Sequence, residues 1–149
     1  MATALRLAGP EPHLRVLLVD DERDVRRMLQ RSMARMGFET TEAGDGQAAL
    51  ELLRHQDFDL VVSDVQMPGM TGIELLGALD REGLDVPVVL VSGSLEVPDA
   101  GAARDLGAFD FFRKPFSLEE LRKAARRAAV SRRASGRHSL RPSAVDSEA

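Results

Sequence analysis

The sequence predicts an α/β fold in which a five-stranded parallel sheet carries helices on both faces. Short apolar runs alternate with amphipathic helical patterns from about residue 14 to residue 130. The runs at 16–19, 60–63 and 88–91 consist almost wholly of apolar residues, as strands buried on both faces do. A carboxylate side chain comes directly after each of the first two runs, which places acidic residues at one edge of the sheet.

The strands are predicted from runs of apolar and β-branched residues bounded by turn residues. In chain order they cover residues 14–19, 38–43, 59–63, 86–91 and 108–112. Because each strand is separated from the next by a helical pattern, the connections are right-handed crossovers and the sheet is doubly wound.

Helical spacing and capping patterns place the helices between these strands. The first helix opens at Asp21 or Glu22 and stops at Gly37, and its apolar positions fall at helical spacing: Val25, Met28, Leu29, Ser32 and Met36. Met28, Met33 and Met36 are expected to pack in the core or to face a partner. The second follows the turn at 44–46 and carries Ala49, Leu50, Leu52 and Leu53. A capping box at Thr71-x-x-Glu74 opens a third helix over 72–81, with Ile73, Leu76 and Leu79 inward. A second capping box, Ser117-x-x-Glu120, opens the last helix.

The helix expected between the fourth and fifth strands is predicted to be short. Pro98 fits only near the start of a helix, and Gly101 weakens a helix interior by about 1 kcal/mol. This segment is therefore expected to be the weakest of the helical elements.

The length and composition are those of one globular domain: 149 residues, 44% apolar and 30% charged. The absence of cysteine excludes disulfides and thiolate metal sites. No apolar stretch approaches the roughly 20 residues of a membrane span, and the first residues lack a signal-peptide core, so we expect a cytoplasmic protein. We divide the chain into an N-terminal tail (1–12), a folded domain (13–130) and a basic, disordered C-terminal tail (131–149).

Charge is distributed unevenly along the chain. Residues 122–141 hold eight Lys or Arg and no acid, whereas residues 1–121 carry a net charge of −10. This pattern fits a solvated helix face followed by an arginine-rich tail, and it also fits a docking or nucleic-acid surface. Because every aromatic residue is Phe, base stacking is poorly supported, and direct nucleic-acid binding is not expected.

Five polar residues lie at or just past the predicted strand ends: Asp20, Asp21, Asp64, Ser92 and Lys114. In a doubly wound sheet these positions converge although they are far apart in sequence. Neighbouring carboxylates stay ionised only beside a cation, and ligands that are all oxygen favour Mg²⁺ or Mn²⁺. Asp21 would serve equally well as the cap of the first helix.

Asp64 is the candidate nucleophile of this group, because a carboxylate can attack phosphorus and form an acyl phosphate. Lys114 would neutralise charge on the phosphoryl group. The Ser92 hydroxyl and backbone N–H groups around Val65 and Gly93 are candidate hydrogen-bond donors to it.

Four segments carry a resemblance to a known family: VLLVDDE (16–22), SDVQMPGMTGIELL (63–76), VVLVSGS (88–94) and GAFDFFRKPF (107–116). With these segments the chain, over about residues 14–130, resembles the receiver domains of bacterial two-component response regulators. The resemblance implies a flavodoxin-like sheet with strand order 2-1-3-4-5.

The resemblance also implies roles for individual residues. Asp64 matches the phosphorylated aspartate, and Asp20, Asp21 and Asp64 match the metal site, completed by the backbone carbonyl of Gln66. Lys114 matches the lysine that pairs with the phosphoryl group. Ser92 and Phe111 match the hydroxyl and the aromatic ring of the conformational switch. A phenylalanine has no hydroxyl to hold it outside, so Phe111 is expected to be buried already without phosphorylation.

By this likeness the chain is a signalling switch, phosphorylated from the phosphohistidine of a histidine kinase or phosphotransfer protein. It would catalyse only its own phosphorylation and dephosphorylation. Its output partner would bind the fourth helix, the fifth strand and the fifth helix, although Pro98 and Gly101 make the fourth helix atypical.

Two other functions compete with this one. A haloacid-dehalogenase-like phosphatase also uses an aspartyl nucleophile and Mg²⁺, but its class has Asp-x-Asp after the first strand, whereas Asp64 is followed by Val65-Gln66. A DNA-contacting regulator could use the basic tail, and salt-dependent DNA binding would reveal it.

Overall fold

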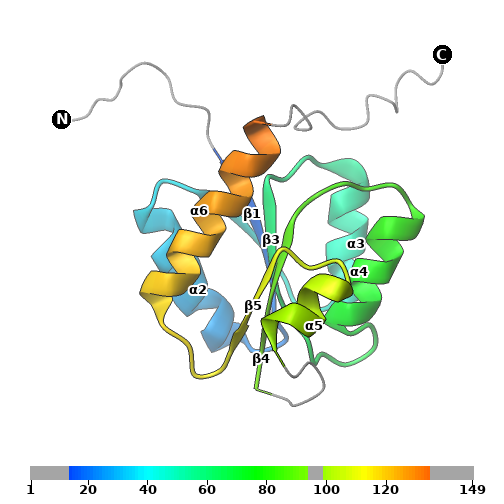
Figure 1. The fold of residues 1–149 in the computed structure, drawn as a ribbon, viewed down its shortest axis with the longest axis horizontal. Helices are drawn as coiled ribbons and strands as arrows, with labels where there is room; N and C mark the ends of the chain where they lie inside the picture. The colour runs from blue at the N-terminus through cyan, green and yellow to red at the C-terminus, as the bar shows by residue number, and fades with distance from the viewer. Residues whose placement is uncertain (1–13, 94–98, 135–149) are drawn as a thin grey trace.

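Five parallel strands form a single sheet at the centre of the molecule, in the order β2-β1-β3-β4-β5 (Figure 1). The computed structural model describes residues 14–93 and 99–134. The strands are β1 (Arg15–Val19), β2 (Glu39–Ala43), β3 (Leu60–Asp64), β4 (Val88–Ser92) and β5 (Asp110–Arg113). The predicted strand order is therefore confirmed. The expected tails at 1–12 and from residue 135 onward lie outside the described residues.

Helices cover both faces of the sheet (Figure 1). They are α2 (Arg23–Arg35), α3 (Gly46–His55), α4 (Gly72–Arg81), α5 (Ala100–Asp105) and α6 (Leu118–Ala134). One core cluster joins α3, α4 and α5 to the sheet, and the other joins α2 and α6 to its opposite face. None of these helices combines the length and the apolar character that a transmembrane span needs.

The central strands β1, β3 and β4 are buried along almost their whole length. Their side chains alternate between the two core clusters, so both faces of each strand must be apolar. The two outer strands depart from the expectation of strands that are apolar on both faces: β5, with the sequence DFFR, is charged at both ends and mostly half-buried, and β2 departs further. Its sequence ETTEA is polar and half-exposed, because an edge strand is not enclosed on both sides.

Caps set the starts of several helices as the sequence indicates. The Thr71 hydroxyl accepts from the Glu74 N–H at 3.0 Å, and the Glu74 carboxylate accepts from the Thr71 N–H at 2.9 Å. This is the predicted capping box of α4. At α6 the Ser117 hydroxyl accepts from the Glu120 N–H at 3.2 Å. The residue before α2 is Glu22, which makes no side-chain cap, so the alternative reading of Asp21 as a helix cap is wrong.

Three details of the helices differ from or refine the predictions. The helix α5 is short, as expected, at six residues, and Asp99 caps it; Pro98 lies outside the described residues. Of the two roles expected for Met28 of α2, packing in the core does not apply, because Met28 is 40% exposed while the neighbouring Leu29 and Met33 face the core. The helix α6 continues to Ala134, four residues past position 130, with Arg132 buried in its last turn.

The glycine at the start of α4 is required by its surroundings. A Cβ atom at Gly72 would lie 2.4 Å from the carbonyl oxygen of Asp64 and 3.0 Å from the Cα of Val65. The Gly72 N–H also donates to the Val65 carbonyl at 2.8 Å. The first turn of α4 therefore packs directly on the backbone of the last residue of β3, and this contact fixes how Asp64 is presented.

We expect the Gly72→Ala variant to lose about 1–3 kcal/mol of the free energy of unfolding, because rigid backbone must move to admit the methyl group. Gly77→Ala in the same helix is the matched control. Its added Cβ would meet only the flexible end of Arg81, at 3.3 Å. The control is expected to be neutral or to gain up to about 1 kcal/mol through better helix propensity. Urea unfolding of both variants measures the difference, and equal stabilities would contradict the packing argument.

Candidate functional site

The predicted site residues meet at the carboxyl edge of the sheet. Asp20 follows β1, Asp64 and Ser92 are the last residues of β3 and β4, and Lys114 follows β5. In a parallel sheet these strand ends lie side by side, and β3 is paired with both β1 and β4. The fold therefore brings together residues that are up to 94 positions apart, from 20 to 114.

Lys114 joins two of the acids. Its Nζ lies 3.3 Å from Asp64 Oδ2 and 3.6 Å from Asp20 Oδ2. Carboxylate oxygens of Asp20, Asp21 and Asp64 all lie within 4.8 Å of one another. In the described part of the chain, this is the one cluster of three or more acids, histidines or cysteines close enough to share an ion.

The two acids that begin the cluster differ in exposure. Asp20 is 1% exposed, whereas the neighbouring Asp21 is exposed. Asp20 Oδ1 accepts from the Glu22 N–H at 2.8 Å, while Asp20 Oδ2 is buried and has no hydrogen-bond partner among the described residues. A buried carboxylate oxygen in that state is costly unless a cation is close to it.

The electrostatics of the cluster follow from this geometry. Burial raises the pKa of Asp20, and the nearby charges of Asp64 and Asp21 raise it further, against the lowering effects of the Glu22 N–H and Lys114. Burial alone would lower the pKa of Lys114, but the charges of Asp20 and Asp64 outweigh it and raise that pKa. Lys114 therefore stays protonated, and one ammonium group faces three carboxylates.

The donor atoms fit a hard divalent cation. Three carboxylates converge, one of them with a buried oxygen that lacks a hydrogen bond, and no sulfur or nitrogen ligand is present in the cluster. Oxygen ligands of this kind suit Mg²⁺ or Mn²⁺. Asp21 is the exposed member, so an ion held here would remain open to water and to a phosphoryl oxygen.

The turn after Asp64 shows which backbone N–H near Val65 faces the site. The Val65 N–H donates to the Val91 carbonyl at 3.0 Å and is therefore already used within the fold. The N–H that points to the Asp64 carboxylate is that of Gln66, which lies 3.3 Å from Oδ1. The role of the Gln66 carbonyl as a metal ligand stays a prediction.

Ser92 and Phe111 lie on the same face of the sheet. Leu90 is paired with Phe111, and Ser92 is two residues further along β4, so their side chains point the same way. Ser92 is fully buried, and its carbonyl accepts from the Lys114 N–H at 2.8 Å. Phe111 is 7% exposed and belongs to the core under α3, α4 and α5, as predicted, whereas Phe112 packs toward α2 and α6.

Sequence reasoning missed Arg26. Its Nη1 donates to the Asp20 carbonyl at 2.6 Å, and its Nε donates to Glu42 at 3.1 Å. This arginine therefore ties the end of β1 to β2 and to the first turns of α2. Arg26 lies one helical turn after Glu22, and this spacing places the two side chains on the same face of the helix, near the end of β1. That spacing is the sequence pattern from which its role at the site could have been predicted.

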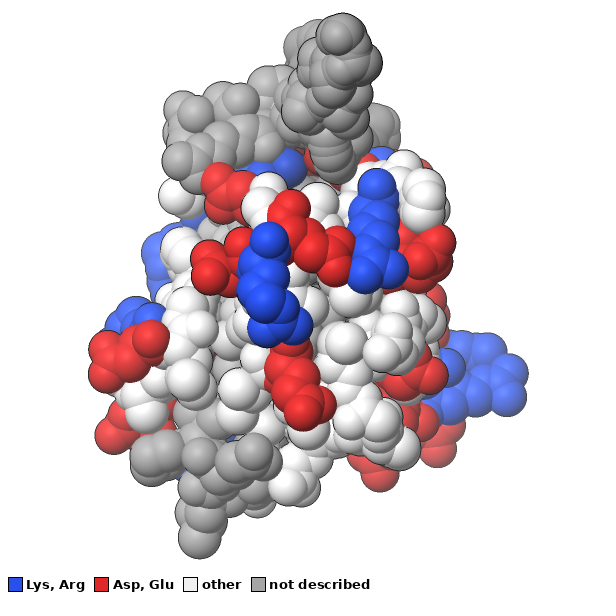
Figure 2. Space-filling model, turned by 90° about the vertical axis from the view of Figure 1, so that its right-hand side faces the viewer, with Lys and Arg blue, Asp and Glu red and all other residues white. Residues whose placement is uncertain are grey.

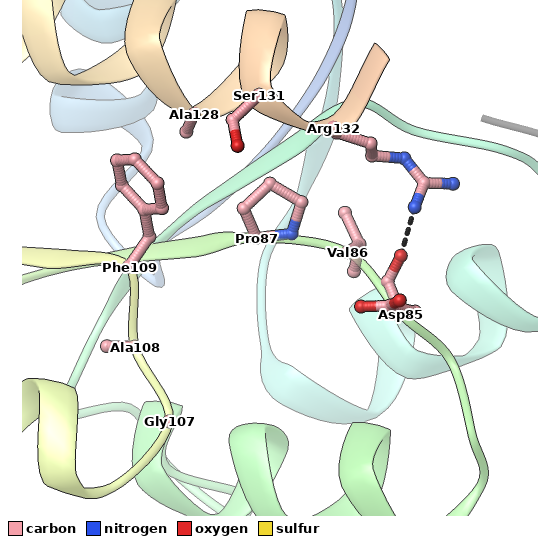
Figure 3. A pocket seen from close by; sticks show the side chains of 9 residues that line it. All are labelled: Asp85, Val86, Pro87, Gly107, Ala108, Phe109, Ala128, Ser131 and Arg132. Atoms are coloured by element: carbon pink, nitrogen blue, oxygen red, sulfur yellow. Dashed lines mark hydrogen bonds between the residues drawn. The ribbon is translucent and has the colours of Figure 1, made fainter. Parts of the chain in front are cut away.

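A separate cavity of about 390 Å³ lies beside the amino ends of β4 and β5, under the last turns of α6 (Figure 3). Val86, Pro87 and Phe109 form an apolar wall, and Arg132 donates to the Asp85 carbonyl at one end. Arg132 also contacts Asp57 at 3.3 Å. Because it lies at the other end of the strands from Asp64, this cavity takes no part in the acidic cluster.

Comparison with known proteins supports the same family along most of the chain. Residues 16–126 match the family described as the response regulator receiver domain. The regulatory protein AtoC of Escherichia coli K12 is 43% identical over 114 residues, which are 76% of this chain and 25% of AtoC. The response regulator MprA of Mycobacterium sp. KMS is 41% identical over 122 residues, which are 82% of this chain and 52% of MprA. The chain thus spans a quarter to about half of these curated relatives.

Solved structures agree with the sequence relatives. The receiver domain of the Francisella response regulator 1452 superimposes with a TM-score of 0.75 at 28% identity, covering 80% of this chain and 98% of that domain. The chemotaxis response regulator CheY4 of Vibrio cholerae gives a TM-score of 0.70 at 30% identity, covering 78% of this chain and 99% of CheY4. With its strand order and its acidic carboxyl edge, this chain belongs to the receiver domains of two-component response regulators.

Proposed function

We propose that Asp64 accepts the phosphoryl group in this receiver domain. The observation that carries the proposal is the position of its carboxylate, 3.3 Å from the Lys114 ammonium and within the cluster formed with Asp20 and Asp21. Phosphoryl transfer depends mainly on positioning and on neutralisation of charge, and this edge of the sheet supplies both.

In the proposed reaction an Asp64 carboxylate oxygen attacks the phosphorus of a phosphohistidine on the donor protein. The new P–O bond forms as the P–N bond breaks, and the leaving imidazole takes its proton from water. Lys114 pairs with a phosphoryl oxygen after the transfer, exchanging part of its contact with Asp64 for the new charge. Asp20, Asp21 and Asp64, with the Gln66 carbonyl, would hold a divalent ion that neutralises phosphoryl charge when it is bound.

Receiver domains are signalling partners of histidine kinases or phosphotransfer proteins, and we assign the phosphodonor of this chain to that class. The output surface is proposed on α5, β5 and α6. Leu106, directly after α5, is 47% exposed, which supports an apolar contact there.

The Asp64→Asn variant is expected to lose phosphorylation entirely, because an amide oxygen is too weak a nucleophile to form the acyl phosphate. Intact mass after treatment with acetyl phosphate and Mg²⁺ measures the added phosphoryl group, which should also be absent in EDTA. Asp45→Asn is the matched control: Asp45 is an exposed acid that caps α3 after β2, and asparagine caps almost as well. Labelling of Asp64→Asn at the wild-type level would overturn the assignment.

The Asp20→Asn variant is expected to be more stable than the wild type by about 1 kcal/mol at neutral pH without divalent ions. The raised pKa of Asp20 means that the folded state holds this proton to higher pH than the unfolded chain does. Stability is therefore lost as the pH rises above about 3.9, the pKa of an unfolded aspartate, and through the raised value. The Asp20→Asn variant should not lose stability over this pH range, and Mg²⁺ should raise its free energy of unfolding less than that of the wild type. Urea unfolding at several pH values tests it, and a less stable variant at pH 7 would contradict the charge argument.

The switch is expected to act mainly on residues 92–105. A phosphoryl group on Asp64 gives the Ser92 hydroxyl a charged acceptor and draws its loop inward. Because Phe111 is already buried, phosphorylation should change the hydrogen exchange around it only a little. Hydrogen exchange with and without beryllofluoride and Mg²⁺ measures this. Protection gained at β2 with none over 92–105 would show that the signal takes another route.

A further inference from the structure

The edge strand β2 contributes none of the five polar residues that meet at the carboxyl edge of the sheet. Positions at or just past the ends of β1, β3, β4 and β5 supply all of them. The strand β2 is nevertheless paired with β1 along its whole length, from Arg15 beside Glu39 to Val19 beside Ala43. Asp20 leaves the sheet directly after the end of this ladder and enters the acidic cluster.

The backbone of Asp20 is tied to β2 at both its N–H and its carbonyl. The N–H donates to the Ala43 carbonyl at 3.2 Å. The carbonyl accepts from Arg26 Nη1 at 2.6 Å, and Arg26 Nε in turn donates to the Glu42 carboxylate of β2 at 3.1 Å. Arg26 therefore links the Asp20 carbonyl to β2 just beyond the last paired residues of the two strands.

The guanidinium of Arg26 is enclosed by the elements around it. Glu42 is paired with Leu18, which lies in the core under α2 and α6, so the Glu42 side chain is on the face of the sheet that α2 covers. The Arg26 side chain is 18% exposed. A Cβ atom at Gly44 would lie 3.7 Å from its Nη1, so the turn after β2 passes close to the guanidinium as well.

This ion pair differs from those on the outer surface of the domain. Over α3 and α4 acidic and basic side chains are intermixed (Figure 2), and the Arg54 side chain, which pairs with Glu82 at 2.6 Å, is 43% exposed. Exposed pairs contribute little to stability because water and salt screen them. Arg26 is more enclosed, and it also donates a charge-assisted hydrogen bond to a backbone carbonyl, which restrains the chain that it contacts.

The position of Arg26 is unfavourable on the grounds of charge alone. Arg26 is the fourth residue of α2, and the dipole of a helix disfavours a cation in the first turn. A guanidinium that contacts the Asp20 carbonyl would also repel a divalent ion bound by the neighbouring carboxylates. The contact with the Asp20 backbone is the favourable interaction that offsets both effects.

We propose that Arg26 is a positioning residue of the cation site, which holds the Asp20 backbone so that this carboxylate can bind Mg²⁺ together with Asp21 and Asp64. The inference rests on the proposed function, because the ion is the one that would assist phosphorylation. Asp20 Oδ2 lies 3.6 Å from Lys114 Nζ and needs the backbone behind it to stay in place. Glu42 neutralises the guanidinium and so limits its repulsion of the ion.

Positioning and charge predict opposite effects when Arg26 is removed. If charge alone matters, loss of a cation beside a cation site should tighten the binding of divalent ions. If the contact with Asp20 matters, its loss should weaken that binding, because groups that orient a metal ligand typically change metal affinity 10- to 100-fold. A role confined to stability would lower the free energy of unfolding and leave the affinity of the folded protein unchanged.

The test measures the binding of Mn²⁺ to the full chain from the electron paramagnetic resonance signal of free Mn²⁺, with Mg²⁺ as competitor. Arg26→Met keeps an apolar stem and is expected to weaken binding about tenfold or more. Arg26→Lys has one ammonium group in place of the planar fork, so it cannot reproduce both contacts and should fall between Arg26→Met and the wild type. Arg27→Met is the matched control: it removes an exposed cation at the next position and should bind at least as tightly as the wild type.

Urea unfolding without divalent ions shows which variants are folded, and Arg26→Lys decides the outcome if Arg26→Met is not. Unchanged or tighter Mn²⁺ binding in a folded Arg26 variant, or an equal loss in Arg27→Met, would overturn the positioning role.

Labelling of the wild type by acetyl phosphate separates this inference from the proposed function. A labelled wild type together with normal Mn²⁺ binding in Arg26→Met would refute the role of Arg26 alone. An unlabelled wild type that still binds Mn²⁺ more tightly than Arg26→Met would refute the proposed phosphorylation alone. A wild type that binds no Mn²⁺ would refute the cation site and the role of Arg26 with it.

Discussion

The charge balance at the carboxyl edge of the sheet is the constraint on which the rest of this domain depends. Three carboxylates converge there, and Lys114 is the ammonium group that lies against two of them. The imbalance is held in place by backbone that cannot move freely: β1 and β3 are buried and paired, and Gly72 packs on the carbonyl of Asp64. A site held short of positive charge in this way favours the binding of a group that supplies it. Under the proposed function, the binding of a cation, and then of a phosphoryl group, would act on the strand ends that hold these carboxylates.

The sequence was sufficient to predict the sheet and most of the site. Buried parallel strands require apolar residues on both faces, and their carboxyl ends converge by topology, so the grouping of Asp20, Asp64 and Lys114 follows from pattern alone. The capping box at Thr71 was equally local, because both of its hydrogen bonds join residues three apart.

What the sequence did not reveal depends on tertiary contacts. The Val65 N–H is used by Val91, a neighbour only in the folded sheet, and so Gln66 supplies the N–H that faces the carboxylate. Arg26 reaches the Asp20 carbonyl and Glu42 because three elements meet there. Met28 has apolar character but lies on the solvent side, since helical spacing alone does not define the edge of the buried stripe.

The contacts of Arg132 give α6 a fixed end. This buried arginine ties the last turn of the helix to Asp57, before β3, and to the Asp85 carbonyl, before β4 (Figure 3). The other end of α6 begins four residues after Lys114, beside the charged cluster. A helix pinned at one end and displaced at the other moves as a lever. A shift at Lys114 would therefore displace the first turns of α6 most, and the helix would rotate about Arg132 rather than translate.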